Sequence, residues 1–469
     1  MYTAYRFIRY IRRKRQRDRA PPTLARTAQR FPAGQPSMRV HQGACATAAG
    51  PSPCPTNPQG IAAPMNDSSS PAVQPARVSP GRAQLPAWRR RSRGARHLLR
   101  LLLVALVFTV SLVPALPKLA GWHSAKIPPV EELRPLAAYP TTWEGGLFDT
   151  DKNYARFEKA FADQLGLRSL MIRVKNEIDY RLFRTSRRVY YGKKGELYGR
   201  SIAEVELPLT EKILGTQAAQ DAAHEGVLGL AARLRAVGVT MVLMTPVQKQ
   251  YFTRERLPFF APRVPDDSHF MHFYQRLKST PELHFVDVVG LMRANEDKFA
   301  PFFKQDFHWS EPMAMATAAD AVRVIAELEG SPVRWRHRLE LDVKPFVGVE
   351  MRFAGRLNMH KDVLEPQLKT TWTALHQRRQ FDPAATGLEF DTATVERADL
   401  LPPTCMYGNS FSDGMLVAGL IEHFQKFTKI SRAQELKEVA PLIAGRCKYL
   451  IVQVLDIQAD RWAAFTVKR

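Results

Sequence analysis

Two short runs of consecutive apolar residues constrain the fold of this chain more than any other feature. Residues 239–245 read Val-Thr-Met-Val-Leu-Met-Thr, and residues 448–454 read Lys-Tyr-Leu-Ile-Val-Gln-Val. Such runs are typical of strands that are buried on both faces inside a parallel sheet. Helical spacing of apolar residues occurs between them, at 217–237, 269–278 and 311–328. Strands that alternate with helices predict a three-layer α/β domain with a parallel sheet.

Further elements are expected on either side of these runs. Apolar residues recur at threes and fours from Phe157 to Phe183, which predicts one helix. Residues 189–198 read as two short strands joined by a turn that contains glycine. The remaining expectations are strands near 284–289 and at 404–407, a helix at 412–427, and a mixture of strands and loops over 331–400.

Most of the net charge of +23 lies in an N-terminal tail. Residues 1–96 hold 18 Lys and Arg residues but only two acidic residues, Asp18 and Asp67. The folded part is therefore only weakly basic, which argues against nucleic acid as its partner. The tail lacks apolar periodicity and is rich in Pro, Ser and Arg, so we expect it to be disordered. A start of translation at Met38 or Met65 is an alternative that would remove little resembling a fold.

An apolar run at 101–116 follows a cluster of arginines at 89–96. With Leu98 and Leu99 it approaches the roughly 20 residues that a spanning helix needs, and Arg100 can snorkel to the interface. The basic flank predicts that the tail is cytoplasmic and that the chain after the run faces outward. A buried core helix would leave the arginines unexplained.

The apolar run is open to two interpretations, a retained signal-anchor or a cleaved signal peptide with a site at 113–115. We favour the anchor because Pro114 and Pro117 disfavour cleavage. The expected organisation is a tail at 1–96, an anchor at 98–117, a linker at 118–150 and a domain at 151–469. In an exported domain Cys405 and Cys447 can form a disulfide. Two unpaired core cysteines remain the other open interpretation.

The segment Gln305-Asp306-Phe307-His308-Trp309-Ser310 is the first candidate for chemistry. Asp306 and His308 are two residues apart and can project from the same side of an extended loop. In a hydrolytic triad the carboxylate fixes the tautomer of the imidazole, and the imidazole takes the proton of the nucleophile. A structural Asp–His pair before a helix that starts near Ser310 is the alternative.

The segment Gly408-Asn409-Ser410-Phe411-Ser412 is the second candidate, because it follows a predicted strand and opens a predicted helix. A serine at this point lies near backbone N–H groups that can stabilise an oxyanion. Ser410 or Ser412 as an ordinary helix N-cap is the alternative. Taken together, the two segments supply a nucleophile, a base and a group that orients the base.

The order of several short motifs resembles the SGNH-like acetyltransferase domain of the AlgJ/AlgX-type alginate O-acetylation proteins and their cellulose-acetylation relatives. The resemblance extends over about 150–456, and the Asp-x-His segment precedes the serine as it does in that family. Two motifs depart from the family pattern: Gly-Asn-Ser stands for Gly-Asp-Ser, and Gly-Glu-Leu-Tyr stands for Gly-Trp-Leu-Phe. The motifs are the helix 157–183, Gly192-Lys193-Lys194-Gly195-Glu196-Leu197-Tyr198, Thr245-Pro246-Val247-Gln248-Lys249, Asp306-Phe307-His308-Trp309 and Gly408-Asn409-Ser410-Phe411-Ser412.

The resemblance implies a periplasmic O-acetyltransferase in which Ser410 is the nucleophile, His308 the base and Asp306 its orienter. It implies transfer of acetyl groups to an exported polysaccharide through an acyl-serine. It also implies a single-pass protein of the bacterial inner membrane, supplied by a multi-spanning membrane acyltransferase. No metal or nucleotide cofactor is expected. Two alternatives remain open, a carbohydrate esterase with the same residues and an inactive scaffold of a polysaccharide export complex.

Overall fold

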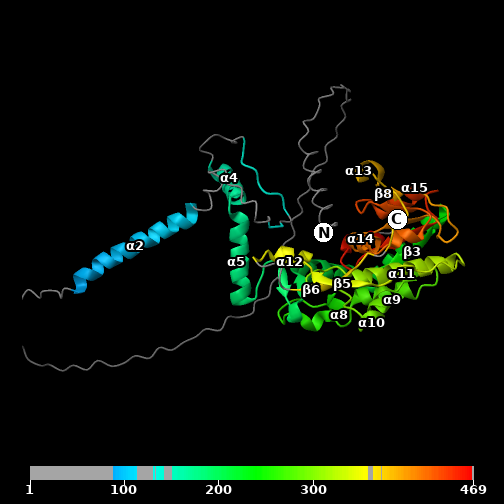
Figure 1. Ribbon diagram of the computed structural model, residues 1–469, viewed down its shortest axis with the longest axis horizontal. Coiled ribbons are helices and arrows are strands. Elements are labelled where there is room, and N and C mark those ends of the chain that lie inside the picture. Colours follow the sequence, from blue (N-terminus) through cyan, green and yellow to red (C-terminus); the bar gives the residue numbers. More distant parts are fainter. Residues whose placement is uncertain are drawn as a thin grey trace, which may run out of the picture. The chain divides into compact units, whose positions relative to one another are not determined.

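The computed structural model describes residues 88–112, 130–131, 134–141, 150–357, 363–370 and 372–466. The predicted tail up to residue 87, and most of the linker 118–150, therefore lie outside the described residues. Residues 150–466 contain the folded domain (Figure 1).

Helix α2 (Trp88–Leu112) covers the predicted anchor as far as residue 112 (Figure 1, blue). It begins inside the stretch that we expected to be disordered, and residues 113–117 lie outside the described residues. Among the helices that the structure describes, none is long and apolar enough to cross a membrane. The anchor at 98–117 is therefore not confirmed and stays a prediction.

A seven-stranded sheet forms the centre of the domain, in the order β4-β3-β11-β9-β10-β8-β7. In that order the strands span His284–Val286, Thr240–Met244, Tyr449–Gln453, Thr404–Tyr407, Phe427–Ile430, Leu388–Thr392 and Arg378–Gln380. The two apolar runs form β3 and β11, which pair in parallel at the centre of the sheet and are almost wholly buried. The prediction of two buried strands is confirmed.

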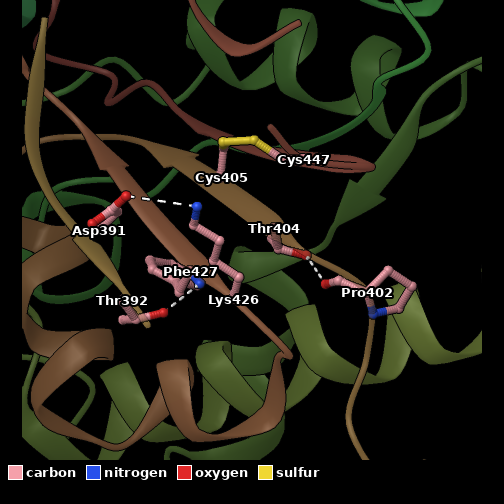
Figure 2. The surroundings of a disulfide bond; sticks show 8 residues. All are labelled: Asp391, Thr392, Pro402, Thr404, Cys405, Lys426, Phe427 and Cys447. Atoms are coloured by element: carbon pink, nitrogen blue, oxygen red, sulfur yellow. Dashed lines mark hydrogen bonds and ion pairs between the residues drawn. A yellow bond between two sulfur atoms is a disulfide. The ribbon is translucent and has the colours of Figure 1, made fainter. Parts of the chain in front are cut away.

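The expectation of a wholly parallel sheet is wrong, because β8 runs antiparallel to both of its neighbours, β10 and β7. The first five strands are parallel. Strands β7 and β8 are joined only by residues 381–387, and a connection this short cannot make the crossover that a parallel pair requires. Side chains reinforce the pairing of β8 with β10. Phe427 N donates to Thr392 Oγ1 at 2.8 Å, and Lys426 pairs with Asp391 at 3.6 Å (Figure 2).

Helices cover the sheet in two groups. Helices α7 (Gln217–Ala236), α9 (His269–Lys278) and α16 (Ala459–Thr466) form one group, in which α7 contacts α9 and α16. Helices α10 (Val288–Asn295), α11 (Glu311–Leu328) and α14 (Ser410–Val417) form the other, in which α11 contacts α10 and α14. Both α7 and α11 contact β3, as a domain with helices on both faces of its sheet requires. The α/β class is therefore confirmed.

Two expected helices differ from the structure. The predicted helix from Phe157 to Phe183 is divided into α4 (Thr150–Gln164) and α5 (Arg168–Phe183), with Gly166 between them, and glycine is a poor helix former. The predicted helix at 412–427 ends at Val417, because Gly419 has a φ of 97°. The chain after it forms a 3₁₀ turn and then β10, which we did not expect.

A disulfide joins Cys405 of β9 to Cys447, which precedes β11 (Figure 2). Their Cα atoms lie 5.7 Å apart. The bond thus links β9 to the residue two positions before its parallel neighbour β11. It resolves the open choice between a pair and two free cysteines in favour of the pair.

Candidate active site

The turn after β9 presents the first predicted site residue, Ser410. Gly408 and Asn409 follow the strand, and α14 begins at Ser410. Asn409 is the N-cap of this helix, because its side-chain Oδ1 accepts a hydrogen bond from Phe411 N at 3.0 Å. The alternative in which Ser410 or Ser412 caps the helix is therefore wrong, and Ser410 Oγ is left to bond elsewhere.

Ser410 bonds to the second predicted residue, His308, across 102 positions in the sequence. His308 Nε2 lies 2.7 Å from Ser410 Oγ, and His308 Nδ1 lies 2.6 Å from Asp306 Oδ1. The three side chains thus form one continuous chain of hydrogen bonds from an almost wholly buried carboxylate to a half-buried hydroxyl. The His308 side chain is 20% exposed, so small molecules in solvent can reach it. The structure brings together all three residues that the sequence singled out.

The imidazole of His308 is also held by aromatic rings. The ring of Phe307 lies 4.0 Å from it and the ring of Phe411 lies 4.9 Å away, measured between centroids. Phe411 comes from the first turn of α14 and Phe307 from the loop before α11, so the contacts join the two segments of the site. Packing of this kind restricts the ring to one orientation, as a base needs.

Asp306 remains ionised in spite of its burial. Burial raises the pKa of its carboxyl, but His308 and hydrogen bonds from backbone N–H groups outweigh this effect and bring the pKa to about 2. The hydrogen bonds come from His308 N at 3.0 Å to Oδ1 and from Val349 N at 2.9 Å to Oδ2. A carboxylate with both oxygens occupied in this way can hold the Nδ1–H tautomer of His308 and leave Nε2 to accept a proton.

Helix α12 (Val349–Ala354) approaches the Asp306 loop so closely that only glycine fits before it. A Cβ on Gly348 would lie 1.8 Å from Gln305 O and 2.8 Å from Asp306 Cβ. This approach lets Val349 N reach the Asp306 carboxylate. Our sequence analysis missed Gly348 and Val349, since neither residue type carries a chemical signal and the surrounding stretch 331–400 has no clear periodicity.

A buried lysine on β10 lies under the Ser410 turn. Lys429 Nζ donates to Gly408 O at 3.2 Å and to Ser412 Oγ, and Ser412 Oγ donates to Asn409 O at 2.5 Å. Burial lowers the pKa of Lys429. No sequence signal indicates this contact, because a lysine between Thr428 and Ile430 is typical of an exposed position.

The sheet, its helices and the Ser-His-Asp arrangement define an SGNH hydrolase-like α/β domain. A family model described as the SGNH hydrolase-like domain of acetyltransferase AlgX matches residues 208–426, just under half of the chain. The match confirms the predicted resemblance to the AlgJ/AlgX-type family over this range. No curated protein matches the chain.

Three solved structures are similar to the chain at low identity. The O-acetyltransferase domain of Pseudomonas putida AlgJ is 13% identical, with 60% of this chain and 99% of that chain covered and a TM-score of 0.40. AlgX of Pseudomonas aeruginosa is 14% identical, with 63% and 69% covered and a TM-score of 0.34. Bacillus cereus PatB1 is 12% identical, with 54% and 91% covered and a TM-score of 0.37. At these scores the three structures carry no weight for activity or substrate.

Proposed function

We propose that the domain is an O-acetyltransferase that moves acetyl groups onto hydroxyls of an exported polysaccharide through an acyl-serine intermediate. The observation that carries the proposal is the hydrogen-bonded chain from Ser410 Oγ through His308 to Asp306. The match to the acetyltransferase family model over 208–426 supports acetyl transfer as the reaction class. The polysaccharide acceptor comes from the family resemblance alone.

In the first step Ser410 Oγ attacks the carbonyl carbon of an acetyl donor while His308 Nε2 takes the hydroxyl proton. The bond between the acetyl group and the donor breaks, and the leaving group receives the proton from His308. Asp306 stabilises the imidazolium that exists between these events. Of the backbone N–H groups at the start of α14, we assign that of Ser410 to the oxyanion of the tetrahedral intermediate, because Phe411 N and Ser412 N already donate to Asn409.

In the second step a sugar hydroxyl loses its proton to His308 and attacks the acetyl carbon. The ester bond to Ser410 breaks, and Ser410 Oγ recovers the proton. Water in place of the sugar would make the same residues an esterase. The two reactions therefore differ in what occupies the acceptor position and not in the residues that react.

We place this reaction outside the cytoplasm, with the chain held in the inner membrane through 98–117. The Cys405–Cys447 disulfide supports this placement, because such bonds persist in oxidising compartments. Acetyl donors are made in the cytoplasm, so the domain requires a membrane acyltransferase as its supplier. A reporter enzyme fused after Arg469 should be active only outside the cytoplasm, and cytoplasmic activity would overturn the orientation.

The deciding experiment compares the purified full chain with its Ser410→Ala variant, using an artificial acetyl ester as donor and a panel of oligosaccharides as acceptors. Acetylated sugar that disappears in the variant supports the transferase. Free acetate alone, also lost in the variant, supports the esterase and contradicts our proposal. Equal silence of two folded proteins, even after the membrane partner is added, supports the inactive scaffold.

A further inference from the structure

Lys249, at the end of the Thr245–Lys249 motif, is a buried cation that the proposed reaction does not use. Its side chain is 2% exposed. Its Nζ lies within hydrogen-bonding distance of three backbone carbonyls, those of Lys304 at 2.9 Å, Asp306 at 3.2 Å and Phe303 at 3.4 Å. All three belong to the loop that carries Asp306 and His308.

The second motif without an assigned task, Gly192–Tyr198, meets the same ammonium group. Glu196 Oε2 lies 3.4 Å from Lys249 Nζ, and the Tyr198 ring centroid lies 4.7 Å from it. Glu196 is itself buried, and its other oxygen accepts from Arg256 at 2.8 Å. Leu197 N donates to Lys304 O at 2.8 Å, so strand β2 (Leu197–Gly199) is bound to the same loop through its backbone.

We propose that Lys249, held by Glu196, is a positioning residue that fixes the Asp306–His308 loop by binding its backbone carbonyls. This inference rests on the proposed function, in which His308 is the base. Lys249 does not touch the reacting atoms. It acts through the Asp306 carbonyl, which is two residues before the base.

The physical need for such a group is clear from the loop. Buried carbonyls without a donor are costly, and three of them point at one small volume. An ammonium group has three N–H donors and no acceptor, so it can serve several carbonyls at once. Its hydrogen bonds to these carbonyls are charge-assisted and stronger than neutral ones. Removing it leaves Lys304 O with its bond from Leu197 N but takes a donor from the carbonyls of Phe303 and Asp306, which the loop can replace only by moving.

One neighbouring carboxyl, that of Glu350, does not neutralise the charge of Lys249 near neutral pH. Glu350 is buried against the same region, and burial together with the charge of Asp306 raises its pKa to about 8. Near neutral pH its carboxyl is therefore protonated. The other carboxyls near the ammonium of Lys249 are those of Glu196, Asp306 and Glu365, and Glu365 accepts from Lys304 N at 2.7 Å.

The test uses three variants of the full chain: Lys249→Met, which keeps the length of the side chain without its charge, Glu196→Gln, and the two combined. Lys448→Met and Glu329→Gln are matched controls. They break a partly exposed Lys–Glu pair of 2.7 Å beside Tyr449, the first residue of β11 and thus at the opposite end of the strands from the site. The readouts are kcat and KM for a chromogenic acetyl ester, and the far-downfield proton NMR signal of the His308 Nδ1–H that binds Asp306.

We expect Lys249→Met to lower kcat on the order of 10²-fold, the cost of a small displacement of a reacting group, with little change in KM. The His308 proton signal should broaden or shift although the far-UV circular dichroism is unchanged. Glu196→Gln should have a smaller effect in the same direction, and the double variant should lose no more than Lys249→Met alone, because the pair acts as one unit. Both controls should keep the wild-type kcat and signal.

A folded Lys249→Met protein with wild-type kcat and an unchanged His308 signal would overturn the proposal. If Lys249→Met does not fold, Glu196→Gln decides, and an unchanged signal and kcat there would overturn it equally. The NMR signal also separates this proposal from the function. A wild-type chain that shows the signal but neither transfers nor hydrolyses acetyl groups contradicts the proposed function. The effect of Lys249→Met on the His308 signal can still be measured in that case, and it tests the role of Lys249 by itself.

Discussion

Replacement of Asp306 by asparagine tests the orientation of the base with the smallest change in shape. The two carboxylate oxygens accept from three donors, His308 Nδ1 and N on one side and Val349 N on the other. An asparagine offers one accepting oxygen and one NH2 group. If the oxygen stays with Val349, the NH2 group faces His308 Nδ1 and selects the tautomer with its proton on Nε2. That nitrogen then cannot take the Ser410 proton.

The size of the effect follows from the loss of the correct tautomer. In Ser-His-Asp enzymes this substitution lowers kcat about 10⁴-fold, which corresponds to about 5 kcal/mol of activation free energy. The assay is hydrolysis of an acetyl ester by the full chain, with Asp399→Asn as a control at a half-exposed carboxylate that pairs with Arg397. A folded Asp306→Asn protein within tenfold of wild-type kcat would refute the orienting role of Asp306.

The same carboxyl predicts a response to acid. Its pKa of about 2 lies below the ordinary value of 3.8, so its stabilising contribution is complete above about pH 4 and is lost as the pH falls through 2. The difference amounts to about 2 kcal/mol. Urea unfolding between pH 4 and 2 should therefore show a smaller loss of stability in Asp306→Asn than in wild type. Equal losses in the two proteins would contradict the lowered pKa.

Three further substitutions test the framework of the site. Asn409→Ala should lower the free energy of unfolding by about 1 kcal/mol and should lower kcat, because the helix loses its N-cap. Asn409→Asp should preserve both quantities, because aspartate is an equally good N-cap. Urea unfolding and ester hydrolysis check these two expectations. Replacing both Cys405 and Cys447 by alanine should cost about 3–4 kcal/mol in urea unfolding, as expected for a separation of 42 residues, and an unchanged midpoint would argue against the bond. Gly348→Ala should lower kcat at wild-type KM, since its Cβ would overlap Gln305 O unless the loop moves; normal kcat would show that α12 can shift freely.

Much of the sheet could be predicted because its central strands are marked locally. The runs that became β3 and β11 are apolar on both faces, and only a buried position makes such a run stable. Strand β10 was missed for the opposite reason. Its sequence, Phe427 to Ile430, contains Lys429, and nothing local shows that this lysine is buried and bonded to Gly408 O. The antiparallel direction of β8 could not be predicted either. It depends on the short connection 381–387, which lies in the stretch 331–400 where the sequence has no clear periodicity.

The three reacting side chains could be predicted from two short segments, since serine, histidine and aspartate carry their chemistry in their residue types. The sequence could not show that Ser410 Oγ and His308 Nε2, which are 102 residues apart in the chain, lie 2.7 Å from each other. That distance is set by groups whose residue types indicate nothing about catalysis, such as Gly348, which permits a close approach, and Lys249 and Lys429, which bond to backbone carbonyls.

The contacts to backbone carbonyls also explain why the hydrogen bonds of the site do not depend on one departure from the pattern of the family that the chain resembles. A carbonyl is present whatever the residue, so the bond from Lys429 to Gly408 O and the bond from Ser412 to Asn409 O do not depend on the side chain at position 409. That side chain has only to accept from Phe411 N, which asparagine does as well as aspartate. The change from Gly-Asp-Ser to Gly-Asn-Ser therefore removes a negative charge beside the nucleophile but none of the hydrogen bonds that hold Ser410 toward His308.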